Sequence, residues 1–92
     1  MPTTKYVVFY LPDPSKMAEA GALFADHIQH SQTFHAAGKM LSFGPFADLI
    51  GQGSMGIFPS KELAEEFVAG DPFVKGEIVA KHEIREWTDT AG

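Results

Sequence analysis

The sequence contains no cysteine. This absence excludes disulfide bonds, metal sites built from thiolates and catalysis by a cysteine nucleophile. It is also consistent with a reducing compartment, in which disulfides are rare. We therefore expect a cytoplasmic protein.

Basic residues are scarce as well. Seven lysines and arginines stand against twelve aspartates and glutamates, which gives a formal net charge of −5. The seven bases are scattered along the chain, so they form no stripe that could neutralise a row of phosphates. We expect no nucleic-acid partner.

Long apolar runs are also missing. The apolar run nearest the N-terminus is "YVVFYL", and "PDPSK" follows it directly. Such a run is too short for the apolar region of a signal peptide or for a membrane span. We expect a soluble protein that has no membrane partner.

The length and composition are those of an ordinary globular chain. With 92 residues, of which 45% are apolar and 21% charged, the chain has room for one hydrophobic core. We expect a single domain over residues 1–92.

The hydrophobic pattern predicts four strands and two helices. Strands are expected over 5–11, 39–46, 54–59 and 77–87, and helices over 13–38 and 60–70, with a connection over 47–53 and a frayed tail over 88–92. The order β-α-β-β-α-β is that of the ferredoxin-like α+β fold, which carries both helices on one face of the sheet. The first strand is apolar on both alternating faces. We therefore expect a homodimer that packs sheet to sheet, because a free apolar sheet face needs a partner.

The first helix predicts an inward stripe of residues at three- and four-residue spacing: Met17, Ala20, Phe24, Ile28 and Ser31. His27 lies at the edge of this stripe. Two other histidines of the helix, His30 and His35, are expected to be solvated, and His82 is expected to pack within the last strand. His27 and His30 are three residues apart and lack the four-residue spacing of a metalloprotease helix. We therefore expect no bound metal.

Two interpretations of His27 remain open from the residues alone. It is either a core-edge histidine bonded to backbone, or a general base whose second nitrogen is held by a carboxylate. Asp71 has two roles that are compatible, because a carboxylate has two oxygens. It can cap a turn of helix over "DPFVKG", with Pro72 at the first position, and it can also bind a histidine. Ser54 is either a surface hydroxyl or a donor to an oxyanion.

Several short motifs occur in order between Tyr6 and Trp87: "HIQHSQTFHAAG", "GPF", "GS", "DPF" and "IREW". In this order and spacing the chain resembles the YCII-related (YciI-like) family. The resemblance implies a dimeric α+β barrel and a His–Asp dyad in a cavity, at His27 and Asp71. The activity associated with the family is dehydrochlorination of a chlorinated, hydroxylated aromatic, without a cofactor. The arginine expected near the start of the first helix is missing, and Lys16 is the candidate to replace it.

We therefore expect a small-molecule enzyme of lyase or isomerase type that needs no cofactor. His27 would abstract a proton, Asp71 would orient and stabilise it, Pro72 would fix the backbone of Asp71, and Ser54 would support the site. The aromatic residues Tyr6, Phe43 and Phe73 either line the cavity or pack in the core. The alternative is a module that binds a small ligand without catalysis, or that serves dimerisation alone. The sequence does not identify the substrate.

Overall fold

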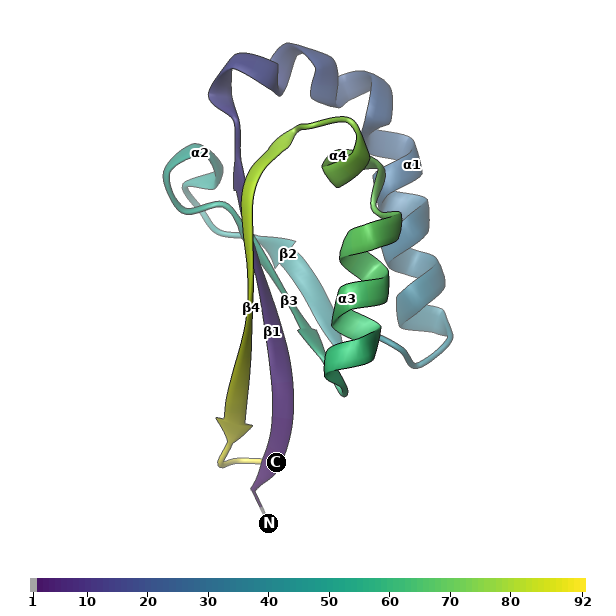
Figure 1. The fold of residues 1–92 in the computed structure, drawn as a ribbon, viewed down its shortest axis with the longest axis vertical. Coiled ribbons are helices and arrows are strands. Elements are labelled where there is room, and N and C mark those ends of the chain that lie inside the picture. The colour runs from purple at the N-terminus through teal and green to yellow at the C-terminus, as the bar shows by residue number, and fades with distance from the viewer. Residues whose placement is uncertain (1) are drawn as a thin grey trace.

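A computed structural model describes residues 2–92 (Figure 1). The elements follow in the predicted order, including the short helical turn after Gly70, with one 3-10 turn and one further short helix added. They are β1 (Thr3–Pro12), η1 (Pro14–Lys16), α1 (Met17–Ala36), β2 (Ser42–Pro45), α2 (Leu49–Gln52), β3 (Ser54–Phe58), α3 (Lys61–Gly70), α4 (Pro72–Lys75) and β4 (Val79–Asp89).

The four strands form one antiparallel sheet in the order β2-β3-β1-β4. The long central strand β1 pairs with β3 on one side and with β4 on the other. In this register Tyr10 lies opposite both Ser54 and His82. The predicted ferredoxin-like α+β class is confirmed.

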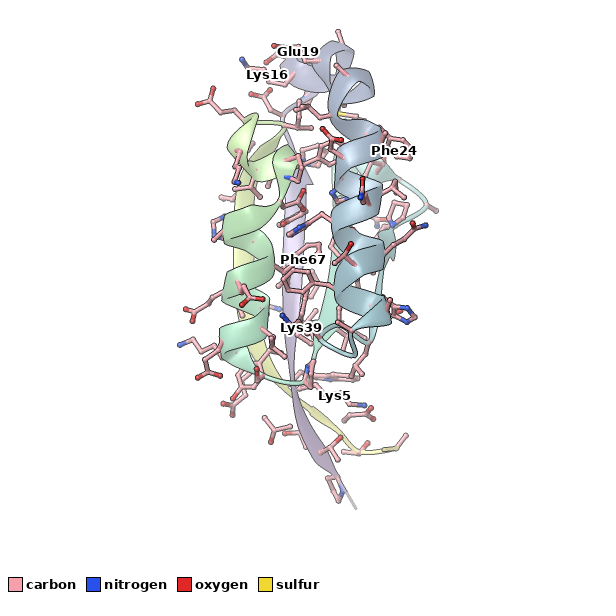
Figure 2. The ribbon with its side chains drawn as sticks, turned by 90° about the vertical axis from the view of Figure 1, so that its right-hand side faces the viewer. Lys5, Lys16, Glu19, Phe24, Lys39 and Phe67 are labelled. Carbon is pink, nitrogen blue, oxygen red and sulfur yellow. The ribbon has the colours of Figure 1, made fainter. Side chains whose placement is uncertain are left out.

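The helices α1, α3 and α4 cover one face of the sheet (Figure 1). The core lies between them and the sheet, and it includes Val8 and Tyr10 of β1. Phe67 of α3 is fully buried at its centre, with ring contacts to Phe34 of α1 and Phe58 of β3. Figure 2 shows Phe67 between α1 and α3. The two long helices are therefore joined to the sheet through this aromatic cluster.

The predicted inward stripe of α1 does not face the core. The buried residues of α1 are His27 and Phe34, whereas the side chain of Phe24 is 56% exposed. Figure 2 shows Phe24 on the side of α1 turned away from α3. The stripe is apolar because it lines a cavity, described below, and not because it packs against the sheet.

The helix ends follow the local sequence. Asp13 caps η1 by accepting a hydrogen bond from the backbone N–H of Ser15, and Ser60 caps α3 by accepting one from Leu63. Gly38 has a φ of 75° just beyond α1, a conformation that suits glycine at the end of a helix. The predicted turn after Gly70 is present as α4, and Asp71 caps it.

Three other expectations were wrong. The connection over 47–53 contains the helix α2, which at four residues is too short to produce a periodic pattern. The expected frayed tail is partly ordered, because β4 continues to Asp89 and pairs it with Thr3. His82 is exposed on β4 and does not pack within a core.

The second face of the sheet carries no helix from α1, α3 or α4 (Figure 1). Along β1, this face presents Val7, which is buried, Phe9, which is half-buried, and Leu11, which is exposed. Arg85 of β4 lies over the ring of Phe9, and Trp87 is 42% exposed. Within residues 2–92, no helix has the length and apolar character that crossing a bilayer requires.

Candidate active site

The predicted partners His27 and Asp71 meet in the structure. His27 comes from the middle of α1, and Asp71 lies at the junction where α3 ends and α4 begins. The Nδ1 atom of His27 lies 2.8 Å from Oδ1 of Asp71. Both side chains are buried, and Asp71 has no exposed surface at all. A buried carboxylate of this kind requires full hydrogen bonding, because burying an unpaired charge is costly.

Asp71 obtains this bonding from three donors. Besides the bond to His27, its Oδ1 accepts a bond of 3.0 Å from the backbone N–H of Phe73. Its Oδ2 accepts a bond of 2.9 Å from the hydroxyl of Tyr10. Because an ionised carboxylate can only accept, the proton on Nδ1 of His27 is assigned to the bond with Asp71. In neutral His27, the lone pair then lies on Nε2, the ring nitrogen that Asp71 does not hold.

Pro72 directly follows Asp71 at the start of α4. It occupies the first position of α4, where its locked φ suits a helix start and its missing N–H removes no bond. Asp71 itself has an extended conformation, with φ of −72° and ψ of 122°. Its side chain can therefore cap α4 and reach His27 together.

Tyr10 is a member of this network that sequence reasoning missed. It is only 3% exposed, and its ring also contributes to the cavity wall. Burial, and after it the charge and hydrogen bond of Asp71, raise the pKa of Tyr10 far above its ordinary value. Its hydroxyl therefore remains a neutral donor to Asp71. A signal was available in principle, because a buried tyrosine hydroxyl usually needs a partner.

Two aromatic rings fix the plane of the His27 imidazole. Phe73 stacks on it with 4.1 Å between ring centroids and an angle of 8° between planes. Phe43 of β2 meets it edge-on at 5.5 Å. Gly56 of β3 leaves the space for Phe43, since a Cβ at Gly56 would lie 2.5 Å from that ring. Stacking and hydrogen bonding together hold His27 in one orientation.

His27 opens onto a cavity of about 820 Å³ between α1 and the β2 side of the sheet. The five residues of the α1 stripe, Met17, Ala20, Phe24, Ile28 and Ser31, all line it. Ser54 lines the same cavity at the start of β3, as do Phe43 and Phe73. The structure thus brings His27 and Ser54 to one cavity, with Asp71 and Pro72 behind the imidazole.

Other candidate residues lie elsewhere. Lys16, the candidate to replace the missing arginine, lies outside the cavity lining and pairs with Glu19, with 3.8 Å between Nζ and Oε2 (Figure 2). Tyr6 packs against the core outside the cavity lining, and its hydroxyl donates to Oε1 of Glu86 at 3.3 Å.

His30 was expected to be solvated, and this was wrong. It is half-buried between Phe34 and Phe67, and its Nε2 lies 2.9 Å from the carbonyl oxygen of Phe67. His35 is exposed, as expected, at the rim of the cavity. Within residues 2–92, no three His, Cys, Asp or Glu side chains are grouped to hold a metal ion.

The family model described as the YCII-related domain matches residues 4–88. The chain belongs to the YCII-related family. Among solved structures, this YCII-related chain is similar to 5-chloro-2-hydroxyhydroquinone dehydrochlorinase (TftG) from Burkholderia phenoliruptrix AC1100, in complex with 2,5-dihydroxybenzoquinone. The TM-score is 0.71 and the identity 21%, over 90% of this chain and 92% of that chain. At this identity the likeness shows the fold alone. No curated protein matches the chain.

Proposed function

We propose that this protein is a cofactor-independent enzyme of lyase or isomerase type that acts on hydroxylated aromatic molecules, including halogenated ones. The observation that carries the proposal is the buried His27–Asp71 pair, with 2.8 Å between Nδ1 and Oδ1, at the wall of a largely apolar cavity. A structural neighbour that is a dehydrochlorinase and binds a small aromatic ligand supports the same class of substrate.

In the proposed reaction, Nε2 of His27 accepts the proton of an aromatic hydroxyl group. The electron pair of the broken O–H bond stays on the oxygen, and the hydroxyl of Ser54 is the candidate donor to that oxyanion. Asp71 stabilises the imidazolium that forms, because it faces Nδ1 as a buried negative charge. The oxygen then forms a carbonyl, and the displaced ring π electrons take up the proton from Nε2 of His27 at the ring carbon that bears the halogen. In an isomerase the reaction ends at this keto tautomer. In a lyase a second hydroxyl then gives its proton to Nε2, its oxygen forms a second carbonyl, and the halide leaves with the electrons of the carbon–halogen bond.

The test uses halogenated hydroquinones as substrates and follows both the absorbance of the quinone product and the release of halide. We expect His27→Ala to lose turnover by about 10²–10⁴-fold, the usual contribution of a general base, with substrate affinity largely retained. His82→Ala is the matched control, because His82 is exposed on β4 outside the cavity lining. Equal turnover by His27→Ala and wild type would refute the role of His27. Binding without turnover in the wild type would favour a ligand-binding module instead.

We also propose that the protein forms a homodimer through the second face of the sheet. Support comes from the apolar row of β1 on that face, which ends at the exposed Leu11, and from the exposed ring of Trp87. The cavity lies on the helix side, so this contact would leave His27 reachable. Light scattering after gel filtration should give a dimer mass for wild type and a monomer mass for Phe9→Lys. A monomeric wild type would contradict the proposal.

A further inference from the structure

The cavity wall carries no permanently charged side chain among the residues that the structure describes. Among the residues that the structure describes, the lining includes no lysine, arginine, aspartate or glutamate. Its ionisable side chains are Tyr10, His27 and His35. The carboxylate of Asp71 lies behind His27, where three donors already engage its oxygens. No permanent cation therefore faces a bound ligand from this part of the chain.

The cavity is also larger than one aromatic ring requires. A cavity of about 150 Å³ is enough to hold benzene, and pockets of about 300–1,000 Å³ bind drug-sized ligands. At about 820 Å³ the cavity belongs to the second class. Along α1, the lining continues from His27 to His35, which are separated by a helix rise of about 12 Å. A ligand of two rings would use this length.

Neither end of the cavity offers a permanent charge from residues 2–92. Toward the start of α1 the lining is apolar, with Met17, Phe24 and Leu49. Toward the end of α1 it includes Met40 and Leu41 together with the uncharged donors and acceptors of Gln32 and Ser42. A carboxylate placed at either end would lose water without gaining a lysine or arginine partner, which is unfavourable. The net charge of −5 also opposes the approach of an anion.

We propose that the cavity selects uncharged hydroxylated aromatics of two-ring size and discriminates against their carboxylated analogues. This inference rests on the proposed function only for the placement of the reacting hydroxyl at His27. It extends that function by naming the charge and the size of the ligand.

The test compares two probes, 2-naphthol and 6-hydroxy-2-naphthoate, which share both rings and a hydroxyl and differ by one carboxylate. Binding is measured by calorimetry at pH 8, where an ordinary histidine is neutral. We expect wild type to bind 2-naphthol at least about tenfold more tightly, which corresponds to about 1.4 kcal/mol. Equal or tighter binding of the naphthoate would overturn the proposal, and so would binding of neither probe.

A charge added to the cavity wall should reverse the preference. In Gln32→Arg, a guanidinium can form paired hydrogen bonds to a carboxylate. We expect the affinity for 6-hydroxy-2-naphthoate to rise at least about tenfold, with little change for 2-naphthol. Gln29→Arg is the matched control, because Gln29 is exposed on the same helix and lies outside the lining. An equal gain in both variants would show general charge attraction and would refute the assignment to this cavity.

The same probes separate this inference from the proposed enzyme activity. The preference for the uncharged probe is an equilibrium property, so we expect it to persist in His27→Ala. A wild type that shows the preference but turns over no substrate would refute the proposed function alone. A wild type that turns over substrate but binds both probes equally would refute this inference alone.

Discussion

Replacing Tyr10 with phenylalanine removes a single hydroxyl from the most buried part of the site. Asp71, which has no exposed surface, would keep its bonds from His27 and Phe73 and lose the donor on Oδ2. A hydrogen bond to a charged group contributes about 1.5–3 kcal/mol to stability. The aromatic ring remains, so its contacts with Phe43 and Phe67 are retained and no large cavity forms. We therefore expect the free energy of unfolding to fall by about 1.5–3 kcal/mol.

Urea unfolding followed by circular dichroism measures this loss. The midpoint of Tyr10→Phe should fall, while the slope with urea stays unchanged, because the surface exposed on unfolding is the same. Tyr6→Phe is the matched control: it removes a hydroxyl from the same strand, but from an exposed bond of 3.3 Å to Glu86. A Tyr10→Phe midpoint equal to that of wild type or of Tyr6→Phe would refute the argument that Asp71 depends on this donor.

Two further outcomes concern Tyr10 and Gly53, which lies against the backbone of Tyr10. Burial and Asp71 raise the pKa of Tyr10 in the folded state, so the unfolded state loses this proton first. The free energy of unfolding should therefore decline as pH rises above about 10. Between about pH 9 and 11 the urea midpoint should drop more in wild type than in Tyr10→Phe. Equal drops in the two proteins would contradict the raised pKa of Tyr10. Gly53→Ala should lower the melting temperature by roughly 4–8 °C or more, since a Cβ there would lie 1.7 Å from the carbonyl oxygen of Tyr10 at a φ of 77°. Gly44→Ala, with open space at its Cβ, is the control, and an equal change in both would count against the steric reasoning.

The sequence predicted the order of the elements well because strands and caps leave local signals. The β-branched and aromatic run of β1, the cap at Ser60 and the Asp-Pro start of α4 each depend on neighbouring residues only. The pairing of His27 with Asp71 is different, since 44 residues separate them. The residues alone left it as one of two interpretations, and the family resemblance indicated it.

The remaining errors share a physical cause. Helical periodicity shows that one face of α1 is apolar, but it does not distinguish a face that meets the core from one that lines a cavity, as Phe24 does. Likewise, Tyr6 and Tyr10 point to the same face of β1, so the alternation of the strand does not distinguish their roles. The hydroxyl of Tyr6 contacts Glu86 of β4, whereas that of Tyr10 contacts Asp71. Their different partners depend on contacts between distant parts of the chain.

The double role of Asp71, in the fold and in the site, predicts how members of this family diverge. Its carboxylate caps α4 and accepts bonds from two other elements, so its loss would weaken the fold even where no reaction is under selection. His27 contributes to stability mainly through that one carboxylate and through its stacking on Phe73. During evolutionary drift after a loss of activity, the histidine should therefore change before the aspartate. A relative with the aspartate alone would have kept the scaffold, and a relative with both residues would have kept the site.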